Sequence, residues 1–109
     1  IEKADLLVVS LAEHNGAYST AFKNVLDWTS RINGKVFQGK RMLLMATSPG
    51  ARGGQSVLEI AKDRFPRHDA ILVGTFYLPS FYENFDKVNG IINDDLKNEL
   101  LEIVNSIDL

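Results

Sequence analysis

Two polar segments of the chain contain the residue types that could bind a ligand. The first holds a carboxylate, an imidazole and an amide in consecutive positions, Glu13, His14 and Asn15. The second runs from Ser48 to Gly54, and its three glycines would let backbone amides approach a planar or anionic ligand closely. Each segment follows an apolar run and precedes an amphipathic one. In an open parallel sheet, ligands bind beyond the carboxyl ends of the strands, so we expect the two segments to form one cleft.

Other chemistries fit these residues less well. The second segment is not a phosphate-binding P-loop, because no Gly-Lys-Ser or Gly-Lys-Thr closes it. The chain has no cysteine, which excludes disulfides, thiolate metal sites and Cys nucleophiles, and its two histidines lack metal-ligand spacing, so we expect no metal site. A hydrolase that uses Ser48 and His14 is the weakest alternative, because no Gly-x-Ser-x-Gly elbow is present.

The composition predicts one globular domain. The chain has 109 residues, of which 45% are hydrophobic and 24% charged, close to the average for globular proteins. The net charge of -2 and the lack of a Lys or Arg run give no reason to expect nucleic acid or a membrane surface as a partner. No apolar run approaches the roughly 20 residues that span a bilayer. Because cysteine is absent, we expect a cytoplasmic protein.

Three short apolar runs predict parallel strands that are buried on both faces. They span Leu6 to Leu11, Arg41 to Thr47 and Ala70 to Tyr77. A first helix is predicted from Ser19, its N-cap, to Ile32. Its apolar residues recur at three and four positions and are predicted to share one face: Ala21, Phe22, Val25, Trp28, Thr29 and Ile32.

Two further helices are predicted from capping and periodicity. Ser56 and Glu59 have the spacing of a capping box at the start of the second helix. The third helix is predicted to begin at Asn93 or Asp94. It carries one wide apolar face, formed by Leu96, Leu100, Ile103, Val104 and Ile107.

The alternation of strands and helices predicts an α/β fold with three layers and an open parallel sheet. Sequential strand order with right-handed crossovers puts the first two helices on one face and the third on the other. This leaves the first strand with a bare edge, through which we expect self-association unless further strands cover it. A flavodoxin-like sheet of order 2-1-3-4-5 has two more strands that would fill this gap. We therefore interpret residues 1–109 as a single partial flavodoxin-like domain that contains the equivalents of strands 3, 4 and 5.

Three motifs of the chain resemble the NADPH-dependent FMN reductases, a family that includes azo, quinone and chromate reductases. Ala12-Glu13-His14-Asn15 resembles the family's Pro-Glu-Tyr-Asn loop. Phe22-Lys23-Asn24 with Leu26-Asp27-Trp28 resembles its Leu-Lys-Asn and Asp-Trp helix. Ser48-Pro49-Gly50 with Gly53-Gly54 resembles its Ser-Pro-Gly and Gly-Gly loop. The order and spacing also fit.

The resemblance implies that the first loop packs its backbone against a flavin ring and that the second contacts the pyrimidine end of the ring. The candidates for flavin contact are Ala12, Glu13, His14, Asn15, Ser48, Pro49, Gly50, Gly53 and Gly54. Two departures are Ala12 in place of proline, which makes the loop less rigid, and His14 in place of tyrosine. The family's phosphate-binding loop follows its first strand and has no counterpart in this sequence.

The function implied by the resemblance is that of an FMN-dependent NAD(P)H oxidoreductase. Such an enzyme transfers hydride from the nicotinamide to FMN and electrons on to a flavin, a quinone, an azo compound or a similar small-molecule acceptor. The flavin supplies the chemistry, so no residue is assigned as an acid, base or nucleophile. The family forms homodimers or homotetramers, and the aromatic, irregular segment from Tyr77 to Phe85 is interpreted as a subunit contact or a lid. The alternative is a flavodoxin-like binding or assembly module that holds no cofactor.

Overall fold

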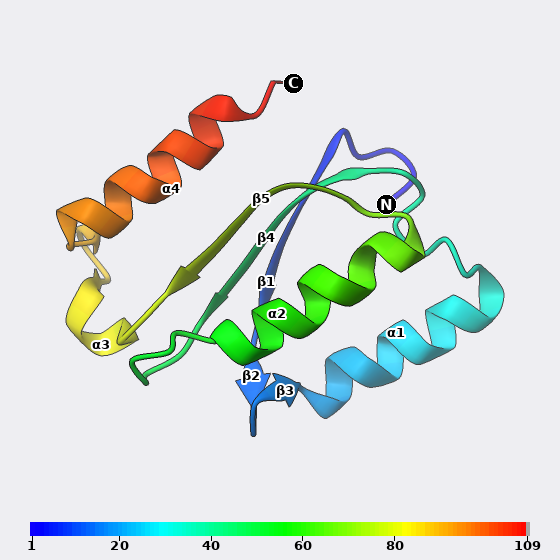
Figure 1. Cartoon of the computed structure of the whole chain (residues 1–109), viewed down its shortest axis with the longest axis horizontal. Coiled ribbons are helices and arrows are strands. Elements are labelled where there is room, and N and C mark those ends of the chain that lie inside the picture. Colours follow the sequence, from blue (N-terminus) through cyan, green and yellow to red (C-terminus); the bar gives the residue numbers. More distant parts are fainter. Residues whose placement is uncertain (109) are drawn as a thin grey trace.

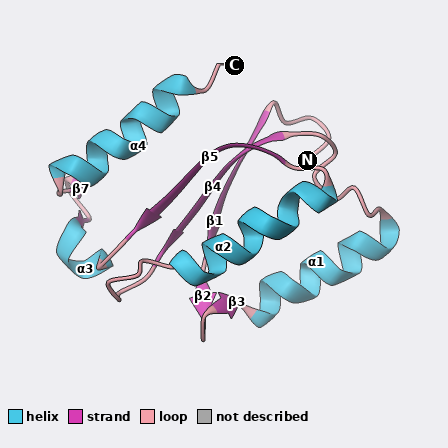
Figure 2. Ribbon diagram, in the orientation of Figure 1, coloured by secondary structure: helices cyan, strands magenta, loops and turns pink. Residues whose placement is uncertain are grey.

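A parallel sheet of three strands forms the centre of the fold (Figures 1 and 2). The computed structural model describes residues 1–108. The strands are β1 (Leu6–Leu11), β4 (Arg41–Thr47) and β5 (Ile71–Leu78), in the order β1-β4-β5. Both pairs are parallel, and the register of the second pair shifts between Met42 and Leu43. The predicted strands and their sequential order are confirmed, and the third strand begins one residue later than expected.

Helices cover both faces of this sheet (Figure 1). Helices α1 (Thr20–Ile32) and α2 (Gln55–Arg64) lie on one face, and α4 (Asp94–Ser106) lies on the other. This confirms the three-layer α/β architecture predicted from the order of the elements. The caps of α1 and α4 are also confirmed, because the side chains of Ser19 and Asn93 accept hydrogen bonds from backbone N–H groups in the first turn of each helix.

The face covered by α1 and α2 contains the main hydrophobic core. Phe65, the first residue of the 3-10 helix η1 (Phe65–His68), is fully buried at its centre and packs against the rings of Tyr18, Phe22 and Phe37. The buried His68 closes the end of this core. Its Nδ1 donates to the carbonyl of Gly34 at 2.9 Å, and its Nε2 accepts from Nε of Arg64 at 3.2 Å.

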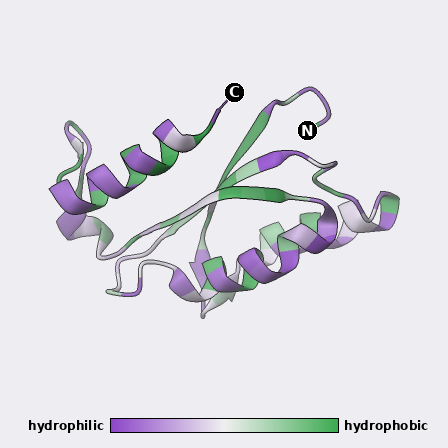
Figure 3. Ribbon diagram, turned by 45° about the horizontal axis from the view of Figure 1, so that its top comes forward, coloured by the Kyte–Doolittle hydropathy of each residue, from purple (hydrophilic) through white to green (hydrophobic). Residues whose placement is uncertain are grey.

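The opposite face is covered by α4 at the β5 side of the sheet. Gly74 of β5 allows this close packing, because a Cβ atom at that position would lie 2.4 Å from Cγ2 of Ile103. At the other side of the sheet β1 is an edge strand, and within residues 1–108 it pairs only with β4. Its strongly hydrophobic residues are coloured green in Figure 3, and Val8 is exposed. The predicted bare edge is therefore present.

The predicted capping box of α2 is wrong. Helix α2 begins at Gln55 with Gly54 as its N-cap, and no side chain of its own first turn caps it. The hydroxyl of Ser56 instead lies 3.3 Å from Nη2 of Arg52, from which it accepts a hydrogen bond. The six residues predicted to share one face of α1 are not all buried: Phe22 packs against the core, whereas Val25 and Trp28 are exposed.

The aromatic segment after β5 is also more regular than predicted. It forms the short helix α3 (Phe81–Asn84) and a hairpin of β6 (Phe85–Asp86) and β7 (Gly90–Ile91). The rings of Phe81 and Phe85 stack with their centroids 4.8 Å apart, while Tyr82 remains exposed.

Candidate functional site

The two ligand-binding candidates lie side by side at the carboxyl end of the sheet. They follow β1 and β4, which are adjacent and parallel, with Leu11 opposite Ala46 at their ends. A hydrogen bond joins them: the carboxylate of Glu13 in the first segment accepts from the backbone N–H of Val57 at 2.9 Å. Val57 lies in the first turn of α2, directly after the second segment. The structure thus brings the two segments together, and that they form one cleft stays a prediction.

The first segment is a tight hairpin rather than an irregular loop. Strand β2 (Glu13–His14) pairs antiparallel with β3 (Ala17–Tyr18) through the turn at Asn15 and Gly16. Both turn residues have positive φ, 52° and 79°, as a two-residue type I′ turn requires. Asn-Gly is the strongest short hairpin signal in a sequence, so this element could have been predicted. Ala12, His14 and Asn15 are exposed, whereas Glu13 is directed into the protein toward α2.

The second segment is fastened to the chain that follows β5. The carbonyl of Ser48 accepts from the N–H of Phe81 at 3.1 Å, and the carbonyl of Gly50 accepts from the N–H of Ser80 at 2.8 Å. The hydroxyl of Thr47 donates to the carbonyl of Leu78 at 2.7 Å just before this point. These three bonds hold the segment in place, with Pro49 and Gly50 exposed.

The glycine pair that ends the second segment has a structural role in this fold. Gly53 and Gly54 are buried with φ of 60° and 82°. A Cβ atom at Gly53 would lie 2.6 Å from the backbone nitrogen of Pro79, and one at Gly54 would lie 2.8 Å from Cβ of Ala46. The close approach of this segment to the end of β4 and to the residues that end β5 therefore requires glycine at both positions. Contact of these two residues with a flavin stays a prediction.

The charge at the start of α2 limits what the site can bind. The backbone N–H groups at a helix N-terminus carry partial positive charge and attract anions. Here the carboxylate of Glu13 already occupies this position by its bond to Val57. A second anionic group at the same place would be repelled, so the junction of the two segments suits an uncharged polar ligand surface better than a phosphate.

Tyr18 is a feature that sequence reasoning missed. It ends the hairpin, and its ring contacts Phe22, with the centroids 5.1 Å apart. Its hydroxyl is buried and has no hydrogen-bond partner among the residues that the structure describes. Burial raises the pKa of the Tyr18 phenol, and the nearby charge of Arg64 opposes this change in part. The only sequence signal that could have indicated a buried role for Tyr18 is its position after an Asn-Gly turn and before a helix.

Comparison with known proteins supports a family assignment. A family model described as NADPH-dependent FMN reductase matches residues 1–83, which include β1, β4, β5 and both candidate segments. No curated protein matches the chain. In the part of the chain that the structure describes, no helix is long and apolar enough to cross a membrane. Over the same residues, no group of three or more His, Cys, Asp or Glu side chains is placed to hold a metal ion.

Proposed function

The chain belongs to the NADPH-dependent FMN reductase family, and we propose that it acts as an FMN-dependent NAD(P)H oxidoreductase. The observation that supports this most directly is the joining of the two candidate segments by the bond between Glu13 and Val57. This bond joins them at the carboxyl end of adjacent parallel strands, which is where ligands bind in open α/β sheets. FMN bound there would supply hydride and electron transfer, and the protein would supply binding and orientation.

The residues of the site fit the ring of the flavin better than its phosphate. The exposed backbone of the hairpin tip at His14 and Asn15, and that of Pro49 and Gly50, would hold the ring and its pyrimidine edge. The phosphate would be held by groups outside these two segments, because Glu13 occupies the start of α2. We include in the proposal that residues 1–109 are part of a larger flavodoxin-like domain. The free edge of β1 supports this, because a further strand could pair there.

Flavin titration, followed by quenching of flavin fluorescence, tests the proposal. If the two segments contact the ring of the flavin but not its phosphate, FMN and riboflavin should bind the chain with similar affinity. Gly50→Val should weaken both by about tenfold or more, the factor that corresponds to 1.4 kcal/mol. Gly50 has space for a side chain, so this change should obstruct the site without unfolding the protein. Gly34→Val is the matched control, because a Cβ atom at Gly34 meets no atom within 4 Å and one at Gly50 meets only Oγ of Ser48, at an ordinary contact distance of 3.8 Å.

Two outcomes would contradict the proposal. Flavin binding that Gly50→Val leaves unchanged would place the cofactor elsewhere. A complete natural protein with neither flavin absorbance nor FMN-dependent oxidation of NAD(P)H would exclude the activity itself. FMN binding much tighter than riboflavin binding would show that the chain contains a phosphate site, and would correct the fit described above.

A binding or assembly module without a cofactor is the second candidate. It is favoured by the structural roles of Gly53 and Gly54, because their close packing against the ends of β5 and β4 explains both residues without a ligand. The same titration separates the candidates, since such a module would bind neither FMN nor riboflavin.

The remaining parts of the proposal follow from the family and the composition. The acceptor would be a flavin, a quinone, an azo compound or a similar small molecule, and the protein would work in the cytoplasm as a homodimer or homotetramer. Steady-state NAD(P)H oxidation with each class of acceptor would identify the substrate.

A further inference from the structure

The chain contains three Asn-Gly dipeptides, and the structure places them in different surroundings. They are Asn15-Gly16, Asn33-Gly34 and Asn89-Gly90, and all three asparagines are exposed. In an Asn-Gly pair the backbone nitrogen of the glycine can attack Cγ of the asparagine side chain, because glycine has no side chain that obstructs the approach. The three pairs share this local chemistry, so differences in their reactivity must come from the fold.

The reaction of such a pair converts asparagine to a carboxylate. The glycine nitrogen loses its proton and bonds to Cγ, the side-chain amide nitrogen leaves as ammonia, and a succinimide ring results. Water then opens the ring at either of its two carbonyl groups, which gives aspartate or isoaspartate. The net change consumes water and releases ammonia without oxidation or reduction. At neutral pH the product carries a negative charge that asparagine lacks.

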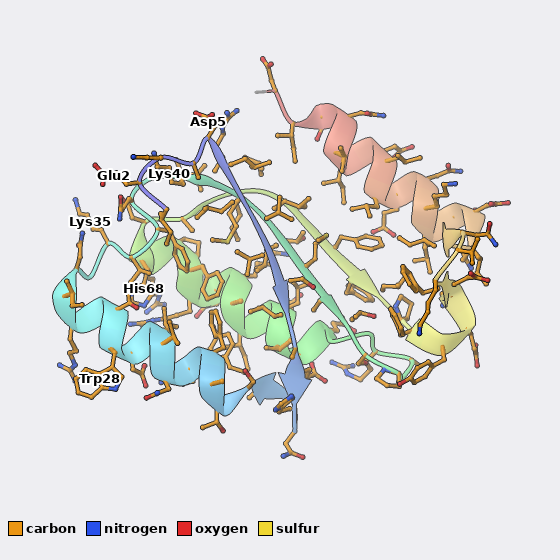
Figure 4. All side chains as sticks on the ribbon, turned by 180° about the vertical axis from the view of Figure 1, so that it is seen from behind. Glu2, Asp5, Trp28, Lys35, Lys40 and His68 are labelled. Atoms are coloured by element: carbon orange, nitrogen blue, oxygen red, sulfur yellow. The ribbon has the colours of Figure 1, made fainter. Side chains whose placement is uncertain are left out.

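At Asn33-Gly34 hydrogen bonds hold the asparagine at both its backbone and its side chain. Asn33 is the C-cap of α1, and its backbone N–H donates to the carbonyl of Thr29 at 3.0 Å. Its side-chain Oδ1 accepts from the N–H of Lys35 at 2.9 Å, and Figure 4 shows Lys35 in the loop that follows α1. A ring can form here only if the side chain of Asn33 first leaves Lys35.

At Asn89-Gly90 a carboxylate lies next to the reacting groups. Oδ1 of Asp86 accepts from the backbone N–H of Val88 at 2.6 Å and from that of Asn89 at 3.2 Å. These bonds hold the pKa of Asp86 below its ordinary value, so the carboxylate stays ionised. Gly90 also belongs to β7, where it pairs with Asp86. The negative charge opposes loss of the proton from the Gly90 nitrogen, because that step creates a second negative charge nearby.

Asn15-Gly16 has neither of these restraints. The two residues form the turn between β2 and β3 and lie outside the paired positions. Within residues 1–108, neither the side chain of Asn15 nor the N–H of Gly16 makes a hydrogen bond. A Cβ atom at Gly16 would meet no atom within 4 Å, so there is space for a ring.

The turn at Asn15 is also held closed by little structure of its own. Strands β2 and β3 have two residues each, and an isolated two-stranded hairpin is marginally stable at best. Ring closure requires rotation about the backbone bonds of Asn15. This rotation starts from a left-handed conformation, with φ of 52°, which is less stable than the extended one for a residue with a side chain.

We propose that Asn15 is a site of spontaneous deamidation, which reacts faster than Asn33 and Asn89 in the folded protein. Neither step of the reaction requires a bound flavin. Aspartate at this position would retain the turn, because it tolerates positive φ as asparagine does. Isoaspartate adds a methylene group to the backbone between β2 and β3, which a two-residue type I′ turn does not accommodate. The isoaspartate form should therefore lose the pairing of β2 with β3.

Mass spectrometry of proteolytic peptides tests the site and its selectivity. The chain is incubated at mildly alkaline pH, once folded and once unfolded in guanidinium chloride, and deamidation is followed at each Asn-Gly pair. In the denaturant the three pairs should react at similar rates, because their local chemistry is the same. In the folded protein Asn15 should react at least about tenfold faster than Asn33 or Asn89.

Two variants add independent measurements. Isoelectric focusing of the incubated wild type should show a new acidic species, and Asn15→Gln should lack it, because a glutamine side chain closes a larger ring more slowly. The isoaspartate form, isolated from the incubated protein, should have a lower Tm than Asn15→Asp. An isoaspartate form as stable as Asn15→Asp would contradict the expected loss of strand pairing.

The rates in the folded protein decide the proposal. Equal rates at the three pairs, or a faster reaction at Asn33 or Asn89, would overturn the selectivity. If Asn15 stays intact in the folded protein while all three pairs react in the denaturant, the hairpin protects Asn15 and the proposed site is wrong.

Discussion

Replacement of Glu13 by alanine should destabilise the protein although residue 13 is distant in sequence from the helix that it caps. The carboxylate of Glu13 accepts from the N–H of Val57, 44 positions later in the chain, at 2.9 Å. The N-cap position of α2 is Gly54, which has no side chain to cap the helix, so the N–H of Val57 has no local side-chain acceptor. Glu13→Ala therefore removes the acceptor of the Val57 N–H, and no side chain in the first turn of α2 replaces it.

The size of the effect follows from two contributions. A hydrogen bond to a charged group contributes about 1.5 to 3 kcal/mol, and a side-chain cap contributes about 1 kcal/mol. Because Glu13 is partly exposed, we expect the lower end, about 1.5 kcal/mol, for Glu13→Ala. Glu13→Gln keeps an acceptor but loses the attraction of the charge to the helix dipole, so it should cost only about 0.5 kcal/mol.

Thermal and urea denaturation, followed by circular dichroism, measure these differences. For a domain of this size, a loss of 1.5 kcal/mol lowers Tm by about 6 to 10 °C. Glu59→Ala is the matched control, because Glu59 is an exposed glutamate of α2 that would matter only if the local capping box had formed. Glu59→Ala should change the free energy of unfolding by less than about 0.5 kcal/mol. The reasoning is refuted if Glu59→Ala costs as much as Glu13→Ala, or if Glu13→Ala leaves Tm unchanged.

Three further substitutions test the packing described above. Gly54→Ala should cost more than about 2 kcal/mol in urea denaturation, because its φ of 82° and its contact with β4 both oppose a side chain, whereas Gly34→Ala should change stability by less than about 0.5 kcal/mol. Gly74→Ala should destabilise the protein through its clash with α4, and Ile103→Ala should relieve part of that loss in a double-mutant cycle. Tyr18→Phe should be neutral or stabilising by up to about 1 kcal/mol, because it removes a buried hydroxyl without a partner. Burial raises the pKa of Tyr18, so the folded state favours the protonated phenol. The wild type should therefore lose stability as pH rises above the ordinary tyrosine pKa of about 10. Tyr18→Phe should lose less stability over the same pH range.

The parts of the fold that sequence analysis predicted well are those set by local patterns. The bounds of β1 and β4 match the prediction because each strand coincides with a continuous apolar run. Burial on both faces, however, holds for most of β4 and not for the edge strand β1, in which Val8 and Ser10 are exposed. Ser19 and Asn93 were predicted as caps because a cap bonds to N–H groups only three residues away. The hairpin turn at Asn15 was missed although its signal was local.

The parts that were mispredicted depend on contacts between distant segments. Ser56 and Glu59 have capping-box spacing, but Gly54 must pack against β4, and this starts the helix one residue before Ser56. Periodicity places the apolar residues of α1 on one face, but it cannot tell whether that face is buried. Packing leaves Trp28 on the outer side.

The sequence by itself determined the strand order, the layers and the position of the two candidate segments, because periodicity, capping and the handedness of crossovers are properties of short stretches of chain. Only the tertiary structure decided what the residues in those segments do. It directs Glu13 to the start of α2 and packs Gly53 against Pro79. Both contacts join residues more than 20 positions apart in the sequence. No local pattern specifies such a pairing. It follows from the way in which β1, β4 and β5 bring their carboxyl ends together.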